Sequence, residues 1–129
     1  MSAAARQEPA VLVVDDDGDI LSAISSALSS FGYSVFTAGS LEHGALALQT
    51  VRVDVLVSDW DLAGEDGAEL LQFGADLQPH AARVLLTGSS PERWAHLVAR
   101  GLAHVGVTKP VTLDDLIEAL ERACRLARR

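Results

Sequence analysis

Short apolar runs alternate with longer amphipathic segments along the chain. Each run is bounded by polar residues, a pattern typical of strands buried on both faces of a sheet. The expected strands cover residues 10–14, 33–37, 53–57, 83–86 and 103–107. Apolar residues at helical spacing predict helices over residues 20–31, 40–49, 68–77, 91–100 and 113–127. Strict alternation of strands and helices predicts an α/β fold whose parallel sheet is covered on both faces.

Local start and stop signals support the expected helix boundaries. Gly32 follows the first helical stripe, and Pro91 stands at the first position of the fourth helix. Thr112 and Asp115 resemble a capping box before the last helix. The fifth strand is interrupted by Gly106, which has no side chain to pack there.

The composition fits a single folded unit. The chain has 129 residues, of which 49% are hydrophobic and 22% are charged, and these values suit one buried core. We expect one domain over residues 10–129, preceded by a short tail over residues 1–9.

Charge and cysteine content narrow the classes of partner. The net charge of −8 argues against nucleic-acid binding by this chain, because such binding needs a basic surface. The single cysteine excludes an internal disulfide framework and fits a reducing compartment. No apolar stretch approaches the ~20 residues that a membrane-spanning helix needs, and the first residues lack the apolar core of a signal peptide. We therefore expect a cytoplasmic domain that binds neither nucleic acid nor membrane.

Reactive side chains stand where four of the expected strands end. Asp15 and Asp16 follow the first strand, Asp59 the third, Thr87 the fourth and Lys109 the fifth. In a sheet with the strand order 2-1-3-4-5, the first and third strands are neighbours at the point where the winding reverses. Ligands of doubly wound sheets bind there. The polar strand ends favour this order, so we expect a flavodoxin-like doubly wound sheet of five parallel strands, with five helices and one pocket.

The chemistry of such a pocket is that of phosphoryl transfer. Three converging carboxylates repel one another unless a cation lies between them, and oxygen ligands of this kind suit Mg²⁺. Asp59 is then placed to act as a nucleophile and form an acyl phosphate. The Lys109 ammonium and the Thr87 hydroxyl would bond the phosphoryl oxygens.

With these residues in view, the chain resembles the receiver domains of two-component response regulators, including the single-domain regulators of chemotaxis. The resemblance runs from about residue 10 to residue 127 and depends on four motifs in order. They are Val13-Val14-Asp15-Asp16, Asp59 followed by Asp66-Gly67, Thr87 and Lys109-Pro110. Each motif alone is weak, but the set in this spacing is highly specific.

The resemblance implies a role for each matching residue. Asp59 corresponds to the phosphoacceptor, and Asp15 and Asp16 to the acidic pair that binds Mg²⁺, with Asp16 as a direct ligand. The backbone carbonyl of Asp61 would be a further ligand. Thr87 corresponds to the hydroxyl that turns toward the phosphoryl group.

Lys109 corresponds to the family's cation, and the resemblance also implies a cis peptide bond between Lys109 and Pro110. It implies a histidine kinase or phosphotransfer protein as phosphodonor. The fourth helix, fifth strand and fifth helix would form the output surface or the interface of a homodimer.

Two positions depart from the family pattern. Ala63 replaces a usual proline, so we expect a less rigid loop after Asp59. Gly106 stands three residues before Lys109, where the family usually has an aromatic residue that moves inward on phosphorylation. That aromatic is absent from the strand, so we expect weaker or differently wired coupling to the output surface.

Two other function classes remain to be distinguished. A pseudo-receiver would bind partners without phosphorylation, and Ala63 and Gly106 favour it, whereas the retained acidic pair and lysine oppose it. A phosphatase of the haloacid-dehalogenase type also uses an aspartyl phosphate. Those enzymes carry the aspartate on the first strand, however, whereas Asp59 follows the third. We expect a phosphoaccepting domain that is not an enzyme toward external substrates.

Overall fold

Every expected strand and helix is present in the computed structural model, which describes residues 8–128. Residues 1–7 of the expected tail lie outside the described residues. The strands are β1 (Ala10–Val14), β2 (Ser34–Ala38), β3 (Val55–Asp59), β4 (Asp61–Leu62), β5 (Glu65–Asp66), β6 (Ala82–Thr87) and β7 (Val105–Thr108). The helices are α1 (Gly18–Ser30), α2 (Leu41–Thr50), α3 (Gly67–Leu77), α4 (Pro91–Ala99) and α5 (Leu113–Ala127).

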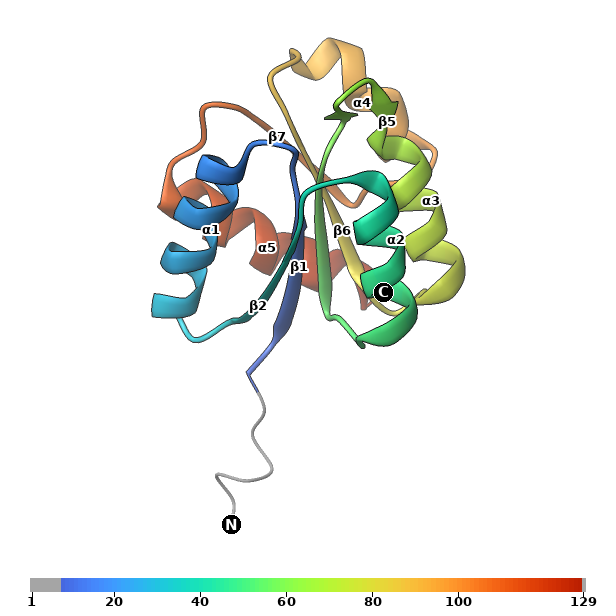
Figure 1. Ribbon diagram of the computed structural model, residues 1–129. Coiled ribbons are helices and arrows are strands. Elements are labelled where there is room, and N and C mark those ends of the chain that lie inside the picture. The colour runs from blue at the N-terminus through green and yellow to red at the C-terminus, as the bar shows by residue number, and fades with distance from the viewer. Residues whose placement is uncertain (1–7, 129) are drawn as a thin grey trace.

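Five of these strands form one parallel sheet in the order β2-β1-β3-β6-β7. This order confirms the expected arrangement 2-1-3-4-5, because β6 and β7 are the fourth and fifth strands of the sheet. Helices α1 and α5 cover one face, and α2, α3 and α4 lie on the other (Figure 1). The chain is therefore a doubly wound, flavodoxin-like α/β domain.

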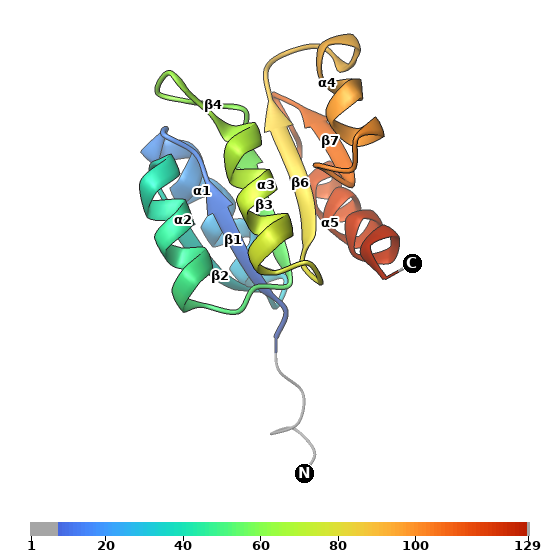
Figure 2. The same ribbon diagram turned by 90° about the vertical axis from the view of Figure 1, so that its right-hand side faces the viewer.

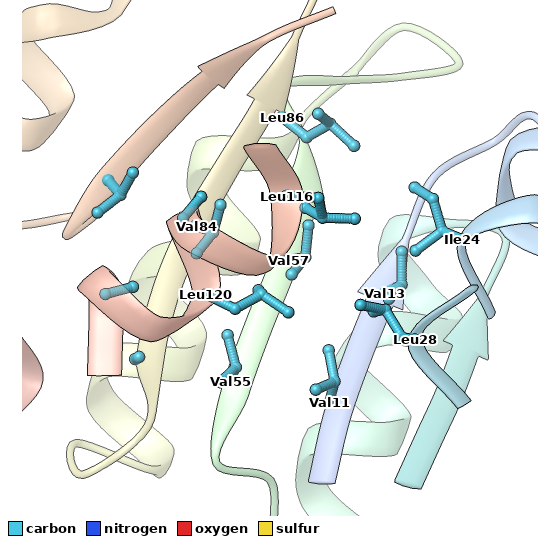
Figure 3. Packing of buried hydrophobic residues seen from close by; sticks show 14 residues of the cluster. Val11, Val13, Ile24, Leu28, Val55, Val57, Val84, Leu86, Leu116 and Leu120 are labelled. Atoms are coloured by element: carbon cyan, nitrogen blue, oxygen red, sulfur yellow. The ribbon is translucent and has the colours of Figure 1, made fainter. Parts of the chain in front are cut away.

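Alternate strand residues fill two separate cores. Val11, Val13, Val55 and Val57 point toward α1 and α5, where they pack with residues such as Leu120 (Figure 3). Their neighbours along the strands pack toward α2 and α3, in a second cluster. Since successive side chains of a strand point to opposite faces, continuous apolar runs are what a sheet buried on both faces requires.

Polar caps define several helix ends. The Asp17 side chain accepts hydrogen bonds from two backbone N–H groups at the start of α1. Ser40 and Thr112 cap α2 and α5 in the same way. Ser90 stands at the cap position of α4, but its side chain makes no capping hydrogen bond.

The starts of two expected strands were wrong by two residues, and the strand expected over residues 53–57 also ends two residues later, at Asp59. Val53 is fully buried, yet its N–H donates to Oε1 of Gln78 at 2.9 Å, and β3 begins only at Val55. The last strand begins at Val105 rather than at residue 103, because the segment before it forms the turn after α4. In both places buried apolar residues outside a strand continue the apolar run, so sequence pattern cannot separate them.

The expected loop after Asp59 is a short antiparallel hairpin. Asp61 pairs with Asp66 and Leu62 with Glu65, which leaves a two-residue turn. Both turn residues have positive φ, 55° at Ala63 and 89° for the glycine after it, as a type I′ turn requires. Figure 2 shows the hairpin beyond the carboxyl ends of the strands, near the start of α3.

A buried arginine holds the carboxyl end of α4. The Arg83 guanidinium donates to the carbonyl oxygens of Leu102, Gly101 and Ala81 at 2.9, 3.0 and 3.2 Å. Its own backbone N–H donates to Nδ1 of His104 at 3.0 Å. Burial lowers the pKa of Arg83 and, together with the charge of Arg83, that of His104.

No helix within residues 8–128 has the length and apolar character needed to span a bilayer.

Candidate functional site

The reactive residues gather at the carboxyl edge of the sheet. Asp15 directly follows β1, Asp59 is the last residue of β3, and Thr87 is the last residue of β6. Lys109 directly follows β7. Because β1 and β3 are hydrogen-bonded neighbours at the centre of the sheet, residues separated by up to 94 positions meet in one pocket.

Lys109 forms the electrostatic centre of this pocket. Its Nζ lies 2.8 Å from Oδ2 of Asp15 and 3.0 Å from Oδ2 of Asp59. The side chain of Asp15 is 1% exposed and that of Asp59 11%, whereas that of Lys109 is 23% exposed, so the two carboxylates are largely shielded from water. Burial alone would lower the pKa of Lys109, but the hydrogen bonds to the two carboxylates outweigh it and the pKa is raised. Lys109 is therefore a permanent cation at neutral pH.

Asp59 is poised between burial and stabilising contacts. Burial raises the pKa of this carboxyl group above its usual range, and the Lys109 hydrogen bond and the amide of Asp61 only partly oppose that rise. The Asp61 N–H donates to Oδ1 of Asp59 at 3.2 Å. One carboxylate oxygen is thus held by a cation and the other by an amide, which fixes the direction in which the group faces.

Three carboxylates fit a divalent cation. Asp15, Asp16 and Asp59 each offer an oxygen, and these oxygens lie within 4.8 Å of one another. An all-oxygen donor set of this size suits Mg²⁺, which binds through one or two carboxylates and retains water or phosphate ligands. The amide contact between Asp61 and Asp59 also places the Asp61 backbone at this pocket. The donor set therefore fits the expected metal.

Thr87 ends β6, the strand beside β3, and is hydrogen-bonded to Ser89 and Lys109. It is 4% exposed, and its Oγ1 accepts a hydrogen bond from the Ser89 N–H at 3.1 Å. Its carbonyl accepts from the Lys109 N–H at 2.7 Å, so the backbones of Thr87 and Lys109 are joined. The Lys109-Pro110 peptide bond is cis, which confirms the expectation drawn from the resemblance.

Gly67 brings helix α3 against β3, the strand that ends at Asp59. Its N–H donates to the carbonyl of Trp60 at 2.6 Å, and a Cβ at this position would collide with the Asp59 carbonyl oxygen. Only glycine permits so close an approach of two backbones. This close approach explains why the Asp66-Gly67 motif needs its glycine.

Further residues line the mouth of the pocket. Trp60, Glu65, Ser89 and Arg93 border an open depression together with Asp61 and Thr87. The Trp60 ring lies 6.1 Å from the ring of His96 on α4, at an interplanar angle of 55°. Trp60 adjoins Asp59 in the sequence, so its place beside the pocket follows from that position. Arg93 and His96 lie on α4, and sequence pattern did not single them out because only folding brings them to the pocket.

Comparison with known proteins gives a consistent result. A family model described as a response regulator receiver domain matches residues 11–121. The transcriptional regulatory protein GlrR of Escherichia coli is 36% identical over 115 residues, which cover 88% of this chain and 26% of GlrR. The chain thus spans about a quarter of the length of that relative.

Solved structures show the same fold. A response regulator receiver domain protein from Clostridium thermocellum matches with a TM-score of 0.82 and 30% identity, covering 93% of this chain and 97% of that one. A CheY-like receiver domain protein from Methanospirillum hungatei matches with a TM-score of 0.86 at 24% identity, covering 95% and 98%. The second match supports the fold alone.

Proposed function

Since the chain belongs to the response regulator receiver domains, we propose that Asp59 is its phosphoacceptor. The observation that carries this proposal is the pair of contacts on the Asp59 carboxylate, with Lys109 Nζ at 3.0 Å and the Asp61 N–H at 3.2 Å. Both donors orient a buried nucleophile toward the pocket. In the transfer, the N–P bond of a phosphohistidine breaks while a P–O bond to Asp59 forms, and the released imidazole takes a proton from water.

The neighbouring side chains stabilise the transferred group. Lys109 pairs with Asp59 before transfer, and its ammonium can then bond a phosphoryl oxygen. Thr87 can exchange its bond from Ser89 for a bond to another phosphoryl oxygen by rotating its side chain. Each residue therefore stabilises charge that develops on the phosphoryl group.

Asp15, Asp16 and Asp59, with the Asp61 carbonyl, would hold Mg²⁺. When bound, this cation neutralises negative charge on the phosphoryl oxygens. The residues that hold it act by orientation: Asp15 accepts the Asp17 N–H at 2.9 Å through Oδ1, while its Oδ2 bonds Lys109. Asp15 is thereby fixed before any ligand arrives.

The phosphodonor would be the phosphohistidine of a histidine kinase or a phosphotransfer protein. An apolar groove lined by Ile20, Ala23, Ile24 and Val111 reaches Lys109, so a donor helix lying there would bring its histidine to the pocket. Since GlrR is a longer regulatory protein, we infer that this domain passes its signal to an output partner or domain. We propose the surface of α4, β7 and α5 for the contact with that output partner or domain, and also for the interface of a homodimer. We propose the cytoplasm as the place where the domain acts.

The domain would accept one phosphoryl group on its own aspartate and would not convert an external substrate. A haloacid-dehalogenase-type phosphatase is disfavoured because Asp59 ends β3, the third strand along the chain, and because the family is that of receivers. A pseudo-receiver is the remaining alternative, and it requires the pocket to be inert.

Acetyl phosphate with Mg²⁺, followed by intact-mass spectrometry, tests the proposal. We expect one added phosphoryl group on the wild type, none on Asp59→Asn, and none when Mg²⁺ is removed with EDTA. Asp76→Asn serves as the matched control, because that aspartate is exposed on α3 and bonds only Gln72. Phosphorylation of Asp59→Asn at the wild-type level would contradict the assignment, and an unmodified wild type would indicate a pseudo-receiver.

A further inference from the structure

An aromatic ring from α4 occupies the space that Gly106 leaves open on β7. A Cβ built on Gly106 would lie 2.5 Å from Cε3 and 2.6 Å from Cη2 of Trp94. The indole therefore lies directly on the strand backbone, where any side chain would collide with it. The Trp94 ring can pack at this place only because residue 106 has no side chain.

The same indole is hydrogen-bonded to the loop that leaves the pocket. Nε1 of Trp94 donates to the carbonyl of Ser89 at 3.2 Å, and Oγ1 of Thr108 donates to that carbonyl at 3.4 Å. The N–H of Ser89 donates in turn to Oγ1 of Thr87 at 3.1 Å. One residue, Ser89, thus joins the pocket hydroxyl to the ring on β7 through its two backbone polar groups.

Few other contacts hold the amino-terminal part of α4. Among the residues of this helix only Leu97 is fully buried, and Trp94 and Val98 pack against the core from half-buried positions. The cap residue Ser90 makes no side-chain bond to the helix. A change in the Thr87–Ser89 loop therefore acts on a helix with little else to restrain that end.

We propose that Trp94 couples the pocket to the α4–β7 surface, with its ring on Gly106 and its N–H on Ser89. This inference rests on the proposed function, since it begins when the Thr87 hydroxyl rotates toward a phosphoryl group on Asp59. That rotation releases the Ser89 N–H, the Ser89 peptide shifts, and the indole that bonds its carbonyl shifts over Gly106. Trp94 is a positioning residue, because it touches no reacting atom.

Tryptophan fluorescence tests the coupling directly. The chain has two tryptophans, so Trp60→Phe leaves Trp94 as the sole tryptophan, which is excited selectively at wavelengths that tyrosine does not absorb. Beryllium fluoride with Mg²⁺ supplies a stable mimic of the phosphoryl group, and ¹⁹F NMR measures its binding independently. We expect the emission maximum and acrylamide quenching of Trp94 to change in proportion to the bound fluoride signal. The same protein carrying Asp59→Asn should show no change.

Failure of the proposed function and failure of the Trp94 coupling give different results in this experiment. Absence of a bound ¹⁹F signal would contradict the proposed function, whereas a bound signal with unchanged Trp94 emission would overturn the coupling alone. A second measurement follows backbone amide shifts induced by beryllium fluoride in Trp94→Phe, which keeps a ring but removes the N–H donor. We expect the shifts at Ser89 to persist and those at Gly106 and Leu97 to shrink.

Gly106→Ala provides the complementary variant. Its methyl group needs the space of the indole, so Trp94 emission should be altered before any ligand is added and should respond less to beryllium fluoride. Gly39→Ala is the matched control, because a Cβ there meets nothing within 4 Å. Two results would overturn the proposal. One is that beryllium fluoride shifts the amides of Gly106 and Leu97 in Trp94→Phe as much as in the wild type. The other is that Trp94 emission in Gly106→Ala responds to beryllium fluoride as it does without this substitution.

Discussion

Among single residues, Asp16 stands out as the exposed member of the three-carboxylate pocket. Lys109 pairs with Asp15 and Asp59 but is not bonded to Asp16. Removing this charge by Asp16→Asn should raise the melting temperature without Mg²⁺, because it relieves repulsion. In the wild type, Mg²⁺ at ten times its Kd should add about 1.4 kcal/mol to the free energy of unfolding.

Asp16→Asn should lose most of that gain, which thermal melts with and without Mg²⁺ measure. Asp114→Asn, at an exposed position in the first turn of α5, is the control and should keep the full response to Mg²⁺. Melting curves of Asp16→Asn that match the wild type in both conditions would argue against a shared cation site.

Gly67 is a second position where adding a single carbon atom should change stability and phosphorylation. A methyl group there would overlap the Asp59 carbonyl oxygen, so Gly67→Ala must push α3 away from β3. We expect a loss of about 1–3 kcal/mol in the free energy of unfolding, as for other overpacked sites, and slower phosphorylation by acetyl phosphate. Urea denaturation and a phosphorylation time course check the two effects, and a variant that matches Gly39→Ala in both would contradict this account.

Among the secondary-structure elements, Gln78 ties the end of α3 to two other segments. Its side-chain oxygen accepts the Val53 N–H, and its amide nitrogen donates to the carbonyls of Leu48 and Val51 at 2.8 and 2.7 Å. Gln78→Leu leaves these three backbone groups, which lie in buried or partly buried surroundings, without their partners, so we expect a loss of about 3 kcal/mol in the free energy of unfolding.

The same substitution at Gln72 is the matched control. That side chain is exposed and bonds only Asp76, so Gln72→Leu should change the free energy of unfolding by less than about 0.5 kcal/mol. Urea denaturation measures both variants, and equal effects would show that the buried bonds of Gln78 do not stabilise the domain.

The β4–β5 turn explains why residue 63 is not the usual proline. Proline fixes φ near −65°, whereas Ala63 has a φ of 55°. Ala63→Gly should raise the free energy of unfolding by up to about 1 kcal/mol, because the left-handed conformation costs a non-glycine residue roughly that amount. Ala63→Pro should lower it by more than about 1 kcal/mol. Calorimetry of both variants checks the order, and a stabilised Ala63→Pro would exclude this turn.

Sequence pattern predicted the elements better than their connections. The positions of Asp16, Asp59, Thr87 and Lys109 favoured the sheet order that the structure shows, because this order makes the first and third strands neighbours and brings their polar ends together. The hairpin after Asp59 escaped prediction because its strands are two residues long, too short for any periodicity. The contacts of Gln78 and Trp94 also escaped it, because each joins segments that only the fold brings together.

For the whole molecule, Arg83 and His104 give stability a specific pH dependence. Burial lowers the pKa of His104 in the folded state below its ordinary value of 6.5, so the unfolded chain binds the extra proton first as pH falls. The free energy of unfolding should therefore decrease as the pH falls below about 6.5, and recover above it. His104→Asn keeps an acceptor for the Arg83 N–H and should flatten this part of the curve.

Urea denaturation of both proteins between about pH 5 and 7.5 measures the difference, in the range where an ordinary histidine titrates. His80→Asn is the control, because His80 bonds a carbonyl oxygen of Val53 and lies at an exposed position. Parallel curves for the wild type and His104→Asn would show that this histidine does not couple to folding.

The two backbone carbonyls just after α4 that Arg83 holds, those of Gly101 and Leu102, have a mechanical consequence for this helix. The carboxyl end of α4 is held to β6 by Arg83, whereas its amino-terminal part is held mainly by the Trp94 indole. The helix can therefore rotate about its carboxyl end. Any displacement would then be smallest at residue 101 and grow toward Pro91. A docked protein that touches the first turn of α4 would sense the largest movement, whereas one that touches the last turn would sense almost none.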